Sequence, residues 1–209
     1  MRRDKLRVGV LASGRGSNLQ AIIDASEKGE LDAEVVVVIS DKSDAYALVR
    51  AQKHGIPNFH INPKDFRNKE DYELAISGKL REFDVRLVLL AGYMRVVTKV
   101  LINAFDGNIM NIHPALLPSF IGLHAQRQAI EYGVRFSGCT VHFVTEDVDG
   151  GPIINQVVVP VYSEDTETSL SERILEKEHI IYPLAVQLFV KGRLKREGRK
   201  VVISGNEDN

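Results

Sequence analysis

The chain has 209 residues, of which 44% are hydrophobic and 26% charged, and its 27 Lys and Arg nearly balance its 28 Asp and Glu. This composition is ordinary for one globular domain with a sizeable core, and the charge balance gives no sign of a nucleic-acid or membrane partner. No apolar run approaches the roughly 20 residues that a membrane-spanning helix needs. The single cysteine, Cys139, excludes an internal disulfide, so we expect a reducing, cytoplasmic setting.

Strand-like and helix-like segments alternate over the first half of the chain. Apolar runs predict strands, and the amphipathic segments between them predict helices. The expected order is a strand at 8–12, a helix at 17–28, a strand at 35–39, a helix at 45–54, a short strand at 58–61, a helix at about 69–83 and a strand at 85–91. Because the strands are continuously apolar, the pattern predicts an α/β, Rossmann-like, doubly wound fold with a mainly parallel sheet.

The pattern changes in the second half. Residues 140–145 and 153–159 predict two strands, and their link has no room for a crossover helix, so they should be antiparallel. A long helix at about 168–191 follows. Residues 200–203 predict an edge strand, and residues 204–209 should fray. No repeat or linker divides the chain.

The segment Asn111-Ile112-His113-Pro114 carries the most specific chemical signal. A strand-like run precedes it, and side chains two apart in an extended chain point to the same face. The proline reinforces the extended geometry. A carboxamide and an imidazolium aimed at one point can stabilise an oxyanion during acyl transfer. Asp149, in a glycine-rich turn, is a carboxylate that the fold can bring back to the histidine.

A second signal is the glycine-containing turn at residues 13–18, between the first strand and the first helix. Main-chain N–H groups and the helix dipole favour a phosphate at such a place. The rival interpretation is a dinucleotide site with Asp41 on the ribose, but Leu19 stands where that fingerprint has its third glycine. Tight turns also use glycine for structural reasons alone, so these residues leave the ligand open.

Several motifs in one order resemble a known family. Over nearly its whole length the chain is similar to the phosphoribosylglycinamide formyltransferases, folate-dependent enzymes of purine synthesis. The matching segments are 14–20, 90–95, 111–114, 116–118, 122–124, 140–144, 149–152, 178–179 and 182–183. The resemblance implies a single formyltransferase domain over 1–209. Its first part, about 1–100, would bind phosphate, and its second part, about 101–209, would hold the catalytic and folate sites.

The resemblance also implies a reaction. The formyl group of 10-formyltetrahydrofolate would pass to the amine of glycinamide ribonucleotide, giving formylglycinamide ribonucleotide and tetrahydrofolate in de novo purine biosynthesis. Asn111 and His113 would stabilise the tetrahedral oxyanion, and Asp149 would keep His113 protonated and help relay a proton. Neither a metal nor a covalent nucleophile is expected, and we interpret Cys139 as a core residue.

Ligand contacts are implied by the same resemblance. The ribonucleotide would contact Gly16, Ser17, Asn18, Leu19, Gln20 and Glu178, the last through ribose hydroxyls. Folate would contact Lys69, Met94, Arg95, Val96, Val97 and Asn111. Lys69 stands where the family often has an arginine, and a lysine keeps the charge but loses the bidentate fork. Ile121 and Ala125 also depart from the family pattern, where proline and threonine are frequent, which puts the loop shape in question.

Three other functions fit the sequence less well. A methionyl-tRNA formyltransferase should carry an additional C-terminal domain, and a formyltetrahydrofolate deformylase a regulatory domain before the first strand, and the sequence predicts neither. A non-catalytic nucleotide-binding regulator could use the first half alone, but would leave Asn111, His113 and Asp149 unexplained. The histidine spacings match no common zinc pattern. We therefore expect two small-molecule partners, with no nucleic acid and no membrane, and a homodimer is compatible with the sequence.

Overall fold

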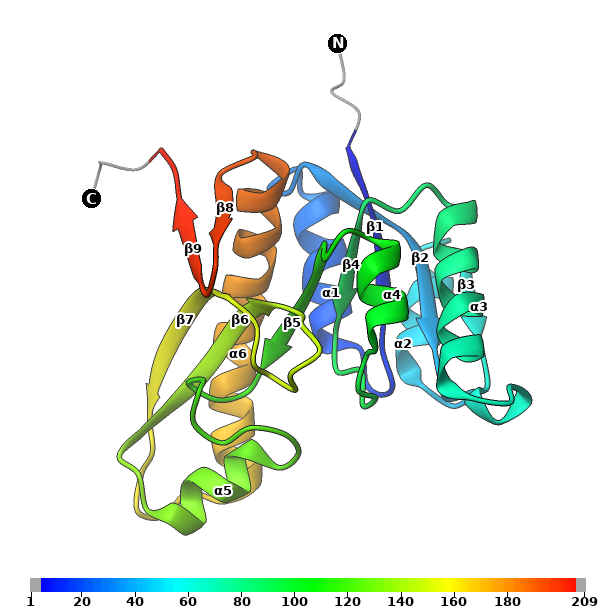
Figure 1. Ribbon diagram of the computed structural model, residues 1–209. Helices are drawn as coiled ribbons and strands as arrows, with labels where there is room; N and C mark the ends of the chain where they lie inside the picture. The colour runs from blue at the N-terminus through cyan, green and yellow to red at the C-terminus, as the bar shows by residue number, and fades with distance from the viewer. Residues whose placement is uncertain (1–4, 206–209) are drawn as a thin grey trace.

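Apolar runs of the first half form the parallel part of one mixed sheet (Figure 1). The computed structural model describes residues 5–205. The parallel strands are β1 (Leu6–Leu11), β2 (Ala33–Ser40), β3 (Asn58–His60), β4 (Leu87–Leu90) and β5 (Ile109–His113), which lie in the order β3-β2-β1-β4-β5. The predicted strands of this half are all present, with bounds shifted by up to two residues.

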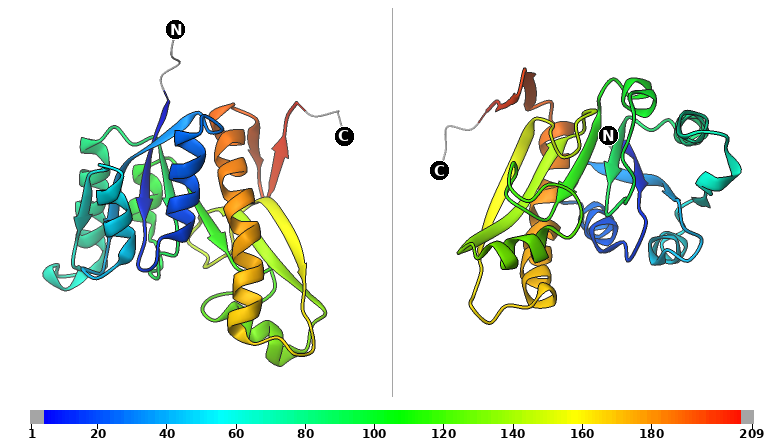
Figure 2. Two further views of the ribbon diagram at one scale, coloured as in Figure 1. Left: turned by 180° about the vertical axis from the view of Figure 1, so that it is seen from behind. Right: turned by 60° about the horizontal axis from the view of Figure 1, so that its bottom comes forward.

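Helices cover both faces of this sheet, because its central strands are apolar on both sides. One face packs against α1 (Ser17–Glu27), α2 (Tyr46–Lys53) and α6 (Glu167–Val190), and the other against α3 (Lys69–Glu82) and α4 (Lys99–Ala104). Within β1, Val10 belongs to the first hydrophobic cluster and Leu11 to the second. Figure 1 shows α3 and α4 in front, and Figure 2 shows α1, α2 and α6 from behind. The doubly wound fold is confirmed.

The second half adds antiparallel strands to the sheet. Strand β6 (Phe136–Phe143) runs antiparallel to both β5 and β7 (Ile153–Pro160), as the short link between β6 and β7 predicted. Cys139 is fully buried in β6, and burial raises the pKa of its thiol to about 12, as suits a core residue. A helix that the sequence did not predict, α5 (Ala125–Tyr132), lies between β5 and β6.

A C-terminal hairpin completes the sheet. The predicted strand at 200–203 is β9 (Lys200–Ile203), but it is not the edge strand, because β8 (Leu194–Glu197) pairs with its outer side. The fraying prediction was wrong for residues 204 and 205, where Ser204 N donates to Arg193 O at 2.8 Å and Arg193 Nη2 donates to Gly205 O at 2.6 Å. Its remainder, 206–209, lies outside the described residues. Over residues 5–205, no helix combines the length and apolar character needed to cross a bilayer.

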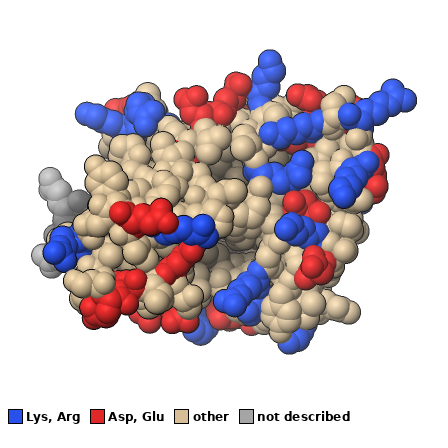
Figure 3. Space-filling view, turned by 90° about the horizontal axis from the view of Figure 1, so that it is seen from below, with Lys and Arg blue, Asp and Glu red and all other residues tan. Residues whose placement is uncertain are grey.

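The parallel strands fix where a ligand can bind. Their carboxyl ends point to one side of the molecule, so the loops after β1, β4 and β5 emerge there together. Figure 3 looks onto this side and shows it hollowed near its centre, with both basic and acidic side chains around the hollow. A short 3-10 turn at Pro63–Asp65 leads from β3 to α3 along the same side. The predicted site residues lie in or beside these loops.

Candidate active site

Three polar side chains meet at the end of β5. Asn111 and His113 alternate along the strand, and the loop after β6 brings Asp149 to both of them. His113 Nδ1 lies 3.4 Å from Asp149 Oδ2, and Asn111 Nδ2 lies 3.5 Å from Asp149 Oδ1. The side chains of His113 and Asp149 are only 5% and 11% exposed, so their interaction is weakly screened by water. The structure thus brings together residues that are far apart in sequence.

The contacts of His113 suit its charged form. Its Nε2 lies 2.8 Å from the carbonyl oxygen of Phe120, which only accepts, so Nε2 carries a hydrogen. Its Nδ1 faces the Asp149 carboxylate, where a second N–H is favourable and a lone pair is not. A proton donated to a ligand must come from one of these nitrogens. For His113 to donate a hydrogen bond to a ligand, a ligand oxygen must therefore replace either the Phe120 carbonyl oxygen or the Asp149 carboxylate oxygen as the acceptor.

His142, which the sequence did not single out for catalysis, orients the Asn111 amide. The β5–β6 register places the two residues opposite each other, and Asn111 Nδ2 lies 3.2 Å from His142 Nε2. His142 Nδ1 donates to the carbonyl of Phe143 at 2.9 Å, and burial lowers the pKa of His142. The neutral ring then has a lone pair on Nε2, which accepts from Asn111. This assigns the Asn111 amide as a donor on the side facing Asp149.

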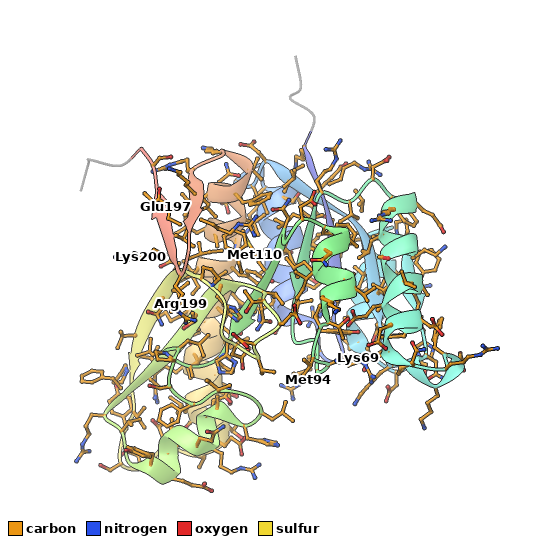
Figure 4. All side chains as sticks on the ribbon, viewed as in Figure 1. Lys69, Met94, Met110, Glu197, Arg199 and Lys200 are labelled. Carbon is orange, nitrogen blue, oxygen red and sulfur yellow. The ribbon has the colours of Figure 1, made fainter. Side chains whose placement is uncertain are left out.

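The loop that carries Asp149 is held close to β6. Asp149 Oδ2 accepts from the main-chain N–H of Gly122 at 2.9 Å, and Asp149 itself adopts a left-handed conformation with φ 50°. Gly151 approaches the Phe143 carbonyl so closely that a side chain would collide with it. The carbonyl of Gly150 accepts from Arg199 Nη1 at 3.1 Å (labelled in Figure 4). These contacts fix the carboxylate beside His113.

The glycine turn after β1 is shaped for main-chain contacts. Gly16 has φ 69°, and a Cβ there would lie 2.8 Å from Ala47 Cα, so only glycine fits without a shift. Helix α1 begins at the next residue, Ser17, and its first N–H groups have no partner inside the helix. Leu19, which is predicted to contact the ribonucleotide, is fully buried, main chain included, and belongs to the first hydrophobic cluster. In this structure it packs the turn against the core.

Glu178 joins the turn from α6. Asn18 Nδ2 donates to Glu178 Oε2 at 2.7 Å, and both residues are buried. Burial raises the pKa of the Glu178 carboxyl, and the Asn18 hydrogen bond opposes this shift. The Asn18 Oδ1 atom is buried without a partner in the described residues. Two predicted ribonucleotide contacts, 160 residues apart, are therefore bonded to each other.

A cavity of about 570 Å³ lies beside this turn rather than at the catalytic centre, lined in part by Ser17, Gln20, Arg50 and His179. The Gln20 side chain is held there, because Arg50 Nη1 donates to its Oε1 at 3.0 Å. Burial and the neighbouring Arg50 cation lower the pKa of His179, whose Nε2 has no partner in the described residues. Sequence reasoning missed Arg50 and His179 here. His179 could have been found from the sequence, because it follows Glu178 within a segment, 178–179, that resembles the family.

The predicted folate stretch, residues 94–97, follows β4. Met94 and Val96 are 60% and 51% exposed, whereas Val97 is buried in the core. The Arg95 guanidinium lies 5.3 Å from the ring centre of Tyr72, which is on α3 one turn after Lys69. Arg95 also lines a second cavity, of about 420 Å³, together with Lys42 and Lys64. Two carboxylates, Asp41 and Asp44, line this cavity as well. Exposed apolar side chains beside a cavity lined by charged groups fit a ligand with a flat ring and a polar end.

Within residues 5–205, no group of three or more His, Cys, Asp or Glu side chains is placed to hold a metal ion. The acidic and basic side chains of the centre instead pair with one another. The arrangement can donate hydrogen bonds to a developing oxyanion and hold a proton next to it. That is the chemistry of acyl-type group transfer.

Comparison with known proteins identifies the family, because residues 6–186 match the formyl transferase family. The chain belongs to this family. The phosphoribosylglycinamide formyltransferase of Haemophilus influenzae is 43% identical over 199 residues, which cover 95% of this chain and 94% of that protein. The human trifunctional purine biosynthetic protein adenosine-3 is 46% identical over 193 residues, but this formyl transferase spans only 19% of its length.

A solved structure agrees with these relatives. The glycinamide ribonucleotide transformylase 1 of Symbiobacterium toebii superimposes with a TM-score of 0.94 at 51% identity, over 96% of this chain and 94% of that one. The expected family and formyltransferase fold are confirmed, with the mainly parallel sheet and antiparallel C-terminal strands. The dinucleotide interpretation, with Asp41 on a ribose, finds no support in these comparisons.

Proposed function

We propose that this formyl transferase moves the formyl group of 10-formyltetrahydrofolate to the amine of glycinamide ribonucleotide, in de novo purine biosynthesis. The observation that carries the proposal is the group formed by the buried His113 with Asn111 and Asp149, at the same edge of the sheet as the glycine turn. The related enzymes of similar length support the choice of substrates. The products are formylglycinamide ribonucleotide and tetrahydrofolate.

Each end of the acceptor has a place in this proposal. Main-chain N–H groups at residues 16–18, where α1 starts, bind the phosphate, and the Gln20 side chain lines the adjoining cavity. Arg50 and His179 add nearby donors. Glu178 accepts hydrogen bonds from the ribose hydroxyls, while Asn18 holds its carboxylate in position. The amine then points along the sheet edge towards β5. This geometry favours a phosphorylated small acceptor over a nucleic acid.

The formyl donor occupies the loop after β4. Met94 and Val96 provide apolar contact for the heterocycle, and the main chain of residues 94–97 reads its polar edge. Arg95 and Lys69 attract the anionic tail, and Arg95 lines the cavity beside this stretch. The formyl carbon then lies next to Asn111 and His113.

Transfer is direct. The acceptor amine attacks the formyl carbon, and a C–N bond forms while the carbonyl oxygen becomes an oxyanion. Asn111 and His113 donate hydrogen bonds to that oxygen. The oxyanion collapses, the bond to the folate nitrogen breaks, and the amine proton passes through Asp149 to that nitrogen. Cys139 takes no part, because its thiol is buried and uncharged at neutral pH.

A formylation assay tests the proposal. Purified protein, 10-formyltetrahydrofolate and glycinamide ribonucleotide should yield tetrahydrofolate and the formylated nucleotide in equal amounts, and omission of the nucleotide should stop folate turnover. Water as the acceptor, with formate released, would instead indicate a deformylase. Asp149→Asn should lower kcat by about 10²-fold or more, as expected when a general acid–base group is lost. Asp147→Asn, in the same loop but exposed, is the matched control and should keep its rate.

The setting of the reaction is part of the proposal. Both substrates are small molecules, and a lone buried thiol suits a reducing cytoplasm. A homodimer remains a prediction that sedimentation of the purified protein can test.

A further inference from the structure

The segment after β4 is held by the loop after β1 and by helix α3. The main-chain N–H of Met94 donates to Ser13 Oγ at 2.9 Å, and the hydroxyls of Tyr93 and Tyr72 lie 3.0 Å apart. These contacts fix its first residues. The last residues of the segment are fixed by a different group, the buried carboxylate of Glu73 on α3.

Glu73 is only 3% exposed, yet it contacts no cation among the hydrogen bonds and ion pairs of residues 5–205. Its Oε1 accepts from the main-chain N–H of Thr98 at 2.8 Å. Its Oε2 accepts from the Thr98 hydroxyl and from the main-chain N–H of Leu101, the latter at 3.2 Å. A buried carboxylate is costly unless donors surround it, and here all three donors come from one short segment.

That segment includes the start of α4. This helix has six residues, which is too short to be stable by itself, and its first N–H groups lack partners inside the helix. The Thr98 hydroxyl accepts a hydrogen bond from the main-chain N–H of Val100 at 3.2 Å, and the Glu73 carboxylate accepts one from the main-chain N–H of Leu101. A negative charge at a helix N-terminus is favourable. Glu73 therefore fixes the position of the first turn of α4. Because residues 94–97 lead directly into that turn, Glu73 also fixes the position of their C-terminal end.

Helix α3 carries both Glu73 and Lys69, the predicted contact of the folate tail. Lys69 and Glu73 are four residues apart, so they lie on neighbouring turns of the same face, and Tyr72 between them stacks under Arg95. Figure 4 shows Lys69 and Met94 at the same lower edge of the N-terminal half. Loss of a hydrogen bond between Glu73 and Thr98 or Leu101 would thus let residues 94–97 move relative to α3.

We propose that Glu73 is a positioning residue for folate binding, which holds the main chain of residues 94–97 in its ligand-binding shape without touching the ligand. The inference rests on the proposed function only in naming folate as the ligand. Glu73 should affect the affinity for 10-formyltetrahydrofolate, and not the affinity for the acceptor, whose contacts lie after β1 and on α6.

Glu73→Gln tests this with little change in shape. A glutamine has one acceptor oxygen where the carboxylate has two, so at least one main-chain N–H of Thr98 or Leu101 loses its partner. KM for 10-formyltetrahydrofolate should rise about tenfold, the scale of a lost hydrogen bond to a charged group, with acceptor KM nearly unchanged. Ser77→Ala, one turn later on α3 and equally buried, is the matched control, because its hydroxyl bonds only within the helix to Leu74 O.

Amide hydrogen exchange supplies a readout that needs no activity. In Glu73→Gln the amides of residues 94–98 should exchange faster than in the wild type, while those of residues 16–20 keep their rates. Ser77→Ala should change neither. Equal rises in both KM values, or unchanged exchange at residues 94–98, would overturn the positioning role.

A second pair of variants covers the case in which Glu73→Gln does not fold. Thr98→Val removes the hydroxyl but keeps a β-branched side chain, and should raise the KM for 10-formyltetrahydrofolate. Thr98→Ser keeps the hydroxyl, and its KM should stay close to that of the wild type. A folate KM that Thr98→Val leaves unchanged would contradict the inference. Failure of the proposed function looks different, since the wild-type protein would then bind folate without forming formylglycinamide ribonucleotide.

Discussion

The phosphate turn and the catalytic centre are built from different parts of the chain. At the turn, the groups proposed to hold the phosphate are mainly main-chain N–H groups, held in place by Gly16 and the start of α1. At the centre they are side chains, and each is oriented by another side chain or a carbonyl. A main-chain donor is lost only when the backbone changes shape, but a side-chain donor is lost in one substitution. Substitutions at the two ends should therefore act on different steps.

The largest effect should come from Asn111→Ala. The amide donates to the oxyanion only when that charge develops, so its loss should lower kcat by about 10²–10³-fold, the scale measured for one oxyanion donor. Binding of 10-formyltetrahydrofolate should change much less, which single-turnover rates at saturating substrate can separate from affinity. Asn108→Ala, just before β5, serves as the control, because its side chain bonds to Arg196 and not to the centre. Normal turnover with weak folate binding would make Asn111 a binding residue instead.

A smaller effect, confined to binding, is expected for Gly16→Ala. The new Cβ would lie 2.8 Å from Ala47 and the residue has φ 69°, so the turn must change shape. A left-handed conformation costs an L-residue about 1–2 kcal/mol, and kcat/KM for the phosphorylated acceptor should fall about tenfold or more. Gly14→Ala meets no atom within 4 Å and should be tolerated. Similar losses in both variants would remove the main-chain account of this turn.

The smallest effect on rate should accompany a gain in stability. Burial raises the pKa of Glu178, so ionisation favours the unfolded chain, and the wild type loses stability as pH rises above the ordinary glutamate value of 4.5. Glu178→Gln removes this loss and still accepts from Asn18. Its free energy of unfolding should exceed that of the wild type at neutral pH, with the difference vanishing below pH 4.5.

The Glu178→Gln variant should also raise the acceptor KM about tenfold, because a charged acceptor for the ribose hydroxyls is gone. Chemical denaturation at pH 4 and pH 7 checks the stability, and steady-state kinetics the KM. Glu176→Gln on the exposed side of α6 is the control and should change neither. A variant less stable than the wild type at pH 7 would show that the carboxylate stabilises the fold.

Much of the fold could be predicted because its signals are local. Apolar runs separated by amphipathic segments gave the parallel strands, and the short link at 146–152 gave the antiparallel pair. Helix α4 was missed because six residues carry almost no periodicity, and its start depends on Glu73 from another helix. Helix α5 was missed because it has only eight residues and its ends are set by His124 and Gly133, which are both left-handed.

The site was predictable only in part, for the same reason. Asn111 and His113 follow from the alternation along one strand, which the sequence contains. The contact between Asn111 and His142 follows from the register of β5 and β6, which no local pattern fixes. The same holds for Arg50 beside the phosphate turn, since α2 has to pack against α1 before the two meet. Long-range pairing, rather than residue type, was the missing information.

One measurement tests the division between the two ends most directly. Single-turnover formyl transfer is followed for the wild type and Asn111→Ala, each with glycinamide ribonucleotide and with the nucleoside that lacks the phosphate. The missing phosphate should weaken binding of the acceptor, and the missing Asn111 amide should slow the formyl-transfer step. The two losses in free energy should add, because distant sites without shared partners act independently. Equal kcat/KM for the two acceptors, or a rate unaffected by Asn111→Ala, would contradict the account.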